Sequence, residues 1–201
     1  MVALLKPPPN RMTVAEFLTW DSGDPTVHAW QLIDGEPVAM VPASDNHGTI
    51  QWALGSLLWP HLTAPGNRCR AVIEPGIVPR GRSDRNYWVP DIGITCAPPT
   101  DGQMLPDPLI LIEILSPINE TETWANVWTY LTIPTVIEVL IVNSMRVEAE
   151  LLRRNADGTW PEVPMRIGPE DALVLDSIGF SVPLAALYQT TTLAMPGGNP
   201  S

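Results

Sequence analysis

Hydrophobic positions recur along this chain at two spacings, one typical of helices and one typical of strands. Apolar residues at positions 50, 54, 57, 58 and 62 follow the helical period and predict a helix that begins at Ser44 or Asn46. A second helix is predicted over residues 121–131, and a short one begins at Thr13, where Thr13 and Glu16 form a capping-box pattern. Runs of β-branched and aliphatic residues predict strands. The predicted strands are 30–33, 37–40, 70–73, 76–78, 87–95, 109–115, 136–142, 147–152 and a last one within 174–184.

Turn residues divide these segments within a single domain. Asp34-Gly35 lies between the first two predicted strands and predicts a tight hairpin turn. Residues 97–108 are rich in proline, glycine and aspartate, which is typical of a loop. The chain shows no internal repeat. We therefore predict a flexible tail over 1–11, one domain over 12–191 and a disordered tail over 192–201.

Composition limits the classes of function. The chain has 201 residues, of which 45% are hydrophobic, enough for one domain with a sizeable core. Its net charge of −11 opposes general adhesion to nucleic acid or anionic membrane, although a local basic groove stays possible. Two cysteines, Cys69 and Cys96, are too few for a disulfide framework or a four-ligand zinc site. We expect reduced thiols and a cytoplasmic protein without a signal peptide or membrane span.

Two strand-like segments each carry one carboxylate. Asp91 ends the run Tyr87-Trp88-Val89-Pro90-Asp91, and Glu113 lies in the middle of the apolar run 109–115. A buried charge is costly unless it is paired or binds a metal. On adjacent strands the two carboxylates would form an oxygen-rich site for Mg²⁺ or Mn²⁺, which Glu74 could complete. The residues alone leave an alternative open, in which Glu113 pairs with an arginine, Asp91 caps a turn and Glu74 is solvated.

Basic residues around these acids are few. Nucleases with two carboxylates commonly place a lysine two residues after the second acid, but position 115 is leucine and Lys6 is the only lysine of the sequence. Arg80, Arg82 and Arg85 belong to five arginines between positions 68 and 85. They form either a solvated loop or a local patch that contacts phosphate. His47, in the first turn of a predicted helix, is either a hydrogen-bonded core residue or a contact for phosphate or water.

Taken together, these residues resemble the Uma-type family of restriction endonuclease-like proteins, within the PD-(D/E)XK nuclease superfamily. The resemblance covers roughly residues 12–190 and is fairly specific as an ordered set. The matching stretches are residues 30–36 (WQLIDGE), His47 with Ile50, residues 74–76 (EPG), residues 86–87 (NY) with 90–93 (PDIG), residues 112–117 (IEILSP) and residues 130–134 (YLTIP).

The resemblance implies a fold and a site. The fold would be of the α/β (α+β) class, a mixed sheet flanked by helices, preceded by an N-terminal helix and a β-hairpin. Mg²⁺ or Mn²⁺ would be bound by Asp91 and Glu113, with Glu74 and the carbonyl of Ile114, and metal-activated water would hydrolyse DNA phosphodiesters. The family typically carries its lysine on the helix after the Glu113 strand, where this chain has Asn126.

Three further polar residues, Asn126, Gln31 and His47, would then position water and phosphate. The family favours glutamate where this chain has Gln31. The first hypothesis is a Mg²⁺-dependent DNA endonuclease that binds DNA weakly through the arginine patch and could form a homodimer. The second is a catalytically inactive relative that binds nucleic acid or a protein partner, because Asn126 carries no charge. A third, an unrelated two-carboxylate hydrolase such as a glycosidase, lacks any residues that mark a sugar site.

Overall fold

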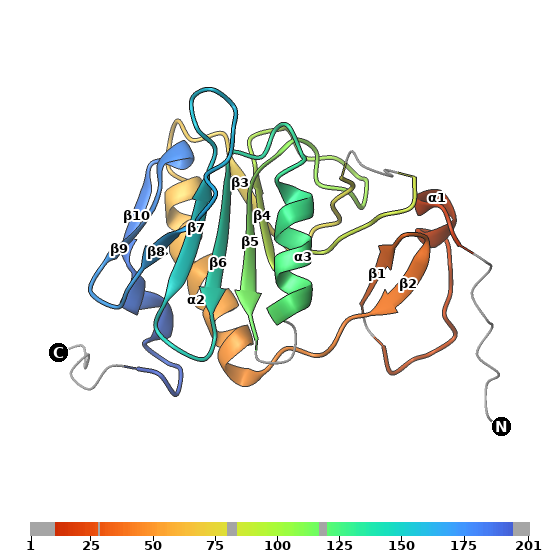
Figure 1. Cartoon of the computed structure of the whole chain (residues 1–201), viewed down its shortest axis with the longest axis horizontal. Helices are drawn as coiled ribbons and strands as arrows, with labels where there is room; N and C mark the ends of the chain where they lie inside the picture. The colour runs from red at the N-terminus through yellow and green to blue at the C-terminus, as the bar shows by residue number, and fades with distance from the viewer. Residues whose placement is uncertain (1–10, 28, 80–83, 117–119, 195–201) are drawn as a thin grey trace.

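The computed structural model describes residues 11–27, 29–79, 84–116 and 120–194 and contains a central sheet with helices on both faces (Figure 1). Its helices are α1 (Val14–Phe17), α2 (Asp45–Leu62), α3 (Glu120–Tyr130) and the short 3₁₀ helices η1 (Asp176–Ile178) and η2 (Leu184–Tyr188). Its strands are β1 (Trp30–Ile33), β2 (Glu36–Ala39), β3 (Arg70–Ile73), β4 (Ile92–Thr95), β5 (Pro108–Leu115), β6 (Glu138–Asn143), β7 (Ala149–Arg153), β8 (Met165–Ile167), β9 (Ala172–Leu175) and β10 (Phe180–Pro183).

The central sheet is mixed, as predicted. Its six strands lie in the order β3-β4-β5-β6-β7-β8. β5 and β6 run parallel and are joined through α3, whereas the other neighbours are antiparallel. In Figure 1, α3 covers the face of the sheet nearer the viewer and α2 lies behind it. The predicted α/β architecture is therefore confirmed, with β5 buried at its centre.

The side chains of β5 alternate between two hydrophobic clusters, one on each face of the central sheet. Ile110, Ile112 and Ile114 pack with the buried face of α2, while Leu111 and Leu115 pack with the buried residues of α3. Successive side chains of a strand point to opposite faces, so Glu113 belongs to the face that α3 covers. The sequence places this acid inside the molecule because every neighbouring position of the strand is hydrophobic.

The N-terminal part forms as the sequence predicts. The Thr13–Glu16 capping box is present, although α1 ends at Phe17 rather than near residues 21–23. Asp34 and Gly35 have φ values of 50° and 85°, the positive values that a type I′ hairpin turn requires. Leu32 and Tyr87 exchange two backbone hydrogen bonds of 2.9 Å, which attach the β1–β2 hairpin to the segment that leads to β4.

Several element boundaries differ from the predictions. β4 begins only at Ile92, because Pro90 has no N–H for a ladder. Instead of the strand predicted over 76–78 and the start of the strand predicted over 87–95, the structure has isolated bridges at residues 76–77 and 87–88. α2 continues through Pro60 to Leu62, and β8 was not predicted at all. Residues 1–10 and 195–201 of the two predicted tails lie outside the described residues, but Leu193 packs against the core. Among the described helices, none is long and apolar enough to span a membrane.

The prediction of reduced thiols was wrong, because Cys69 and Cys96 form a disulfide. Arg70 pairs with Thr95 in the antiparallel ladder of β3 and β4, so the residue before β3 lies opposite the residue after β4. The sequence separates these cysteines by 27 residues, and only the register of the two strands brings them together. The cytoplasmic prediction loses the support that it drew from reduced thiols.

Candidate active site

Asp91, the residue directly before β4, lies beside Glu113 on the neighbouring strand β5. Ile92 pairs with Ile112 in the antiparallel ladder of β4 and β5, so continuing the register by one residue places Asp91 opposite Glu113. Both residues are buried, with 9% and 7% of their surface exposed. The backbone N–H of Ile114 donates to Asp91 Oδ2 at 2.6 Å. The Asp91 carboxylate thus accepts the Ile114 N–H in place of the backbone carbonyl that a longer β4 would have offered.

The first turn of α2 brings a histidine to Asp91. Ser44 caps α2, and its hydroxyl accepts a hydrogen bond from the N–H of His47 at 3.3 Å. His47 Nε2 lies 2.8 Å from Asp91 Oδ1, and the imidazole is buried. One turn later, Gln51 donates to the backbone carbonyl of Asp91 at 3.0 Å. Helix α2 therefore fixes the orientation of the carboxylate, and both oxygens of Asp91 are hydrogen-bonded.

Helix α3 supplies the partner of Glu113. The hydroxyl of Tyr130 donates to Glu113 Oε1 at 2.6 Å, and the tyrosine is fully buried. Burial raises the pKa of Tyr130 well above its usual value, and the charges of Glu113 and Asp91 raise it further. Both carboxylates therefore disfavour ionisation of the Tyr130 hydroxyl. The sequence identified Tyr130 only as part of a family motif and gave it no role in the site.

Glu74 and Ile114 lie next to the two acids with different geometry. The N–H of Glu74 donates to the Asp91 carbonyl at 3.0 Å, but Glu74 has a left-handed φ of 48° and an exposed side chain. In the described part of the chain, no three or more His, Cys, Asp or Glu side chains are grouped to hold a metal ion. A strand residue directs its N–H and C=O towards the same neighbour, so the Ile114 carbonyl lies on the Asp91 side. The closest oxygen donors are therefore two carboxylates and one backbone carbonyl.

Two amide side chains come from opposite sides of the molecule. Asn126 lies one turn before Tyr130 on α3, so the two residues share a face of that helix. Asn126 is buried, and its Oδ1 atom has no hydrogen-bond partner. Gln31, on β1, accepts a hydrogen bond of 3.4 Å from the N–H of Val89, two residues before Asp91. Both predicted amides are therefore held close to the segments that carry the acids.

The arginine patch is described only in part. Arg85 lies 3.7 Å from Asp84, and both side chains are substantially exposed. Arg80 and Arg82 lie outside the described residues. The patch that we predicted from all three arginines stays a prediction.

A different buried acid adopts the arrangement of a structural ion pair. Glu138 is fully buried on β6, where Arg153 of the neighbouring strand lies 2.8 Å from its Oε1 atom. Its carboxylate also accepts hydrogen bonds from Ser177. Sequence reasoning missed this pair because the two residues become neighbours only through the register of β6 and β7, in which Glu138 faces Arg153.

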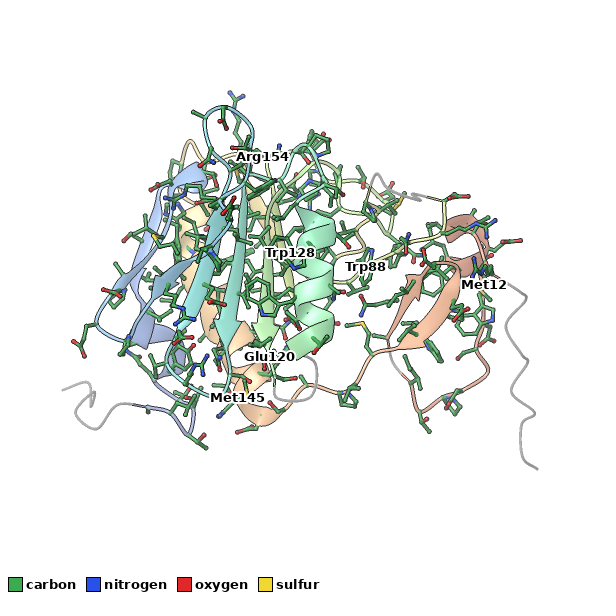
Figure 2. All side chains as sticks on the ribbon, in the orientation of Figure 1. Met12, Trp88, Glu120, Trp128, Met145 and Arg154 are labelled. Carbon is green, nitrogen blue, oxygen red and sulfur yellow. A yellow bond between two sulfur atoms is a disulfide. The ribbon has the colours of Figure 1, made fainter. Side chains whose placement is uncertain are left out.

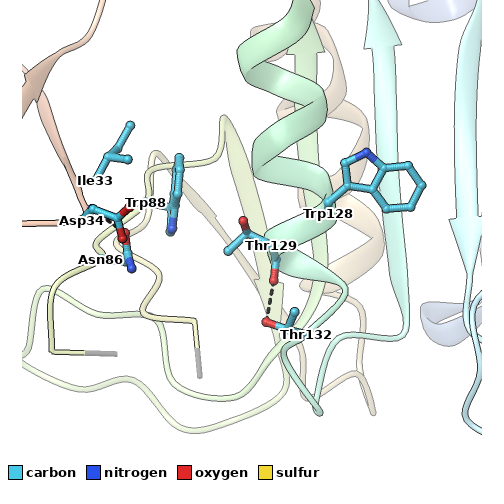
Figure 3. A pocket seen from close by; sticks show the side chains of 7 residues that line it. All are labelled: Ile33, Asp34, Asn86, Trp88, Trp128, Thr129 and Thr132. Carbon is cyan, nitrogen blue, oxygen red and sulfur yellow. Dashed lines mark hydrogen bonds between the residues drawn. The ribbon is translucent and has the colours of Figure 1, made fainter. Parts of the chain in front are cut away.

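A cavity of about 460 Å³ opens beside the C-terminal half of α3. Figure 3 shows its walls: one side comes from the end of β1 and the segment before β4, and the other from α3 and the turn after it. The lining residues are Ile33, Asp34, Asn86, Trp88, Trp128, Thr129 and Thr132. Figure 2 also places Trp88 between α3 and the N-terminal hairpin.

Comparisons with known proteins bear on the family and the fold of this chain. The Uma2 family model, described as "Putative restriction endonuclease", matches residues 14–185. The uncharacterized protein slr1290 of Synechocystis is 29% identical over 190 residues, which cover 89% of this chain and 92% of that protein. The crystal structure of "a putative nuclease belonging to DUF820" from Anabaena variabilis matches with a TM-score of 0.71 at 18% identity, over 89% of this chain and 98% of that one. At this identity, the likeness shows a common fold.

Proposed function

Because the chain belongs to the Uma2 family of restriction endonuclease-like proteins, we propose that it is a Mg²⁺-dependent endonuclease that hydrolyses DNA phosphodiesters. The observation that carries this proposal is the juxtaposition of Asp91 and Glu113, two buried carboxylates opposite one another on adjacent strands. A fold that needed only stability would place hydrophobic residues there, because burying two acids is costly.

The residues at this position fit a hard divalent cation. The carboxylates of Asp91 and Glu113, with the carbonyl of Ile114, are the oxygen donors that Mg²⁺ and Mn²⁺ prefer. The buried Oδ1 atom of Asn126 lacks a donor, which a water molecule at the site would supply. When bound, the cation would stabilise negative charge on the phosphate and lower the pKa of water. For Glu74, whose side chain is exposed, metal binding stays a prediction.

The other residues of the site hold the two carboxylates in a fixed orientation. His47 and the Ile114 N–H hold the two oxygens of Asp91, and Tyr130 holds one oxygen of Glu113. Fixed carboxylates lose little freedom when they engage a cation, which favours binding. The amides of Asn126 and Gln31 are suited to hydrogen-bond phosphate or water.

Calorimetric titration with Mn²⁺ tests the proposed site. We expect Asp91→Asn and Glu113→Gln each to weaken binding about 100-fold or more, since even outer-shell partners of metal ligands typically contribute about 10–100-fold. Both changes should also abolish nicking of supercoiled plasmid in Mg²⁺. Glu162→Gln, a change of an exposed acid with the same loss of charge, is the matched control and should bind Mn²⁺ normally. Unchanged Mn²⁺ affinity in both site variants would show that the site is wrong.

Asn126 favours a second candidate function, a nucleic-acid-binding relative without catalytic activity. An asparagine cannot supply the positive charge that a lysine would place beside the phosphate. Under this alternative, the parent protein binds Mn²⁺ and DNA but nicks no plasmid. Metal binding without cleavage at any Mg²⁺ or Mn²⁺ concentration would support the second function over the first.

A further inference from the structure

We propose that the cavity beside α3 binds one unpaired nucleobase, and that it prefers bases with an exocyclic amino group. This inference rests on the proposed function, because the base would belong to the strand whose phosphate lies at Asp91 and Glu113. It goes further by naming the form of the substrate: DNA with an unstacked base, in place of a regular duplex.

The cavity and the candidate active site share the same three segments of the chain. Ile33 lines the cavity from the face of β1 that also carries Gln31, two residues earlier. Trp88 precedes Val89, which donates to Gln31. On α3, Thr129 follows Asn126 by three residues and therefore lies on the same side of the helix. A nucleotide bound at the acids could thus place its base in the cavity.

The shape of the cavity suits a flat ring. In Figure 3 the indole of Trp88 is seen nearly edge-on, so that one ring face is turned towards Thr129 and Thr132. Bases stack readily on aromatic side chains, and the stacking tolerates different sequences. A volume of about 460 Å³ is within the usual range of small-molecule sites.

The charges of the lining favour a base over a phosphate. The seven described lining residues include one carboxylate, Asp34, and no cation. None of these seven side chains carries a positive charge that would attract a phosphate. A neutral ring with polar edges fits both the aromatic and the polar parts of the lining.

The hydrogen-bonding groups indicate which bases fit. Thr129 and Thr132 donate their hydroxyl protons to the carbonyls of Ala125 and Thr129, so their oxygens can act only as acceptors towards a ligand. The indole N–H of Trp88 is a donor that is buried without a partner. Acceptors therefore outnumber donors among these groups, which complements the amino groups of adenine and cytosine. Thymine offers two carbonyls and no amino group.

Free nucleosides test the cavity without the metal site. Titrations in EDTA, followed by ligand-observed NMR, should show deoxyadenosine and deoxycytidine binding about fivefold or more tightly than thymidine, the preference that one hydrogen bond of about 1 kcal/mol gives. Thr129→Met fills the cavity and should abolish this binding. Thr121→Met changes an exposed threonine of the same helix and should leave it unchanged. Circular dichroism checks that both variants are folded.

A DNA experiment distinguishes the cavity from the metal site. In fluorescence anisotropy, a duplex with one bulged adenine should bind more tightly than the fully paired duplex, and Thr129→Met should remove the difference. Glu113→Gln should keep the preference for deoxyadenosine even if it abolishes metal binding. Equal binding of all nucleosides, or deoxyadenosine binding that survives Thr129→Met, would overturn the nucleobase site. If the parent protein binds deoxyadenosine in this way but binds no Mn²⁺, only the proposed function is overturned.

Discussion

At the scale of single residues, the two acids of the candidate site differ in their partners. Asp91 is held by a histidine and a backbone N–H, whereas Glu113 is held by a tyrosine hydroxyl. The Tyr130 hydroxyl fixes the orientation of one Glu113 oxygen without adding a charge of its own. By contrast, Glu138 is paired with Arg153 and has a structural role.

Replacing Tyr130 by phenylalanine should destabilise the protein and reduce its sensitivity to alkali. A buried hydrogen bond to a charged group contributes about 1.5–3 kcal/mol, so the free energy of unfolding at pH 7 should fall by about this amount. The raised pKa of Tyr130 means that its contribution is complete below the ordinary tyrosine pKa, about 10, and is lost as pH rises above it. Urea unfolding at pH 7 and at pH 9–11 measures both effects.

Tyr188→Phe is the matched control, because Tyr188 is also buried and donates to the backbone carbonyls of Asn143 and Glu148. Its loss should lower stability without changing Mn²⁺ affinity. If Tyr130→Phe leaves Mn²⁺ affinity as unaffected as Tyr188→Phe does, the tyrosine does not position Glu113 for a metal.

Asn126 should limit catalysis rather than folding. Lysine has a higher helix propensity than asparagine, so Asn126→Lys is compatible with α3. The added ammonium could lower the barrier to hydrolysis by about 3 kcal/mol, a typical contribution of one charge-stabilising group. Nicking of supercoiled plasmid in Mg²⁺ should therefore rise above the parent level, and Glu113→Ala should abolish the gain. A folded Asn126→Lys protein that binds metal and DNA without faster nicking would favour the inactive relative.

At the scale of elements, the site depends on where strands end. β4 starts one residue after Asp91, and the vacant ladder position beside Ile114 is taken by the aspartate side chain. The opposite end of β4 is joined to β3 by the Cys69–Cys96 disulfide. The disulfide therefore helps to hold β4 in register with β3, and Asp91 directly precedes β4.

Removing this disulfide should lower stability. Closing a loop of 27 residues by a disulfide is expected to contribute about 3.5 kcal/mol through the lost entropy of the unfolded chain. We expect Cys69→Ala/Cys96→Ala to reduce the free energy of unfolding by about this amount, measured by urea denaturation. Adding dithiothreitol should reproduce the effect in the parent and have none in the double variant. Identical denaturation curves with and without reductant would contradict a contribution of the disulfide.

At the scale of the whole molecule, the proposed function requires an acidic protein to bind a polyanion. The net charge of −11 repels DNA at long range, so binding depends on local contacts and should be weak and steeply salt-dependent. The end of β1 and helix α3 supply two walls of the cavity, as Figure 3 shows. The proposed base site in this cavity requires a single strand or an extruded base.

Replacing Arg80, Arg82 and Arg85 by serine should weaken DNA binding. Each lost phosphate contact should reduce the slope of log affinity against log salt by about 0.7–0.9. Anisotropy titrations at several salt concentrations measure the slope. Arg166→Ser, which changes an exposed arginine on β8, is the control. Affinity and slope that survive the triple change would place the DNA surface elsewhere.

The sequence by itself determined the local features of this protein. The capping box at Thr13, the hairpin turn at Asp34-Gly35 and the helical period of α2 were readable because each depends on residues a few positions apart. Asp91 and Glu113 stood out for a similar reason, since each is an acid within or directly after a hydrophobic run. The family resemblance, which is also carried by linear motifs, supplied the mixed sheet.

Only the tertiary structure decided which distant residues meet. Strand register joined Cys69 to Cys96 and Glu138 to Arg153, and the packing of α3 on β5 joined Tyr130 to Glu113. Strand β8 was not predicted because it has only three residues, two of which are exposed, so it shows no detectable hydrophobic alternation. Local periodicity fixes the face on which a side chain lies, but not the strand or helix opposite it. That choice depends on how the whole core packs, because long-range register is set by burial of all the apolar faces together.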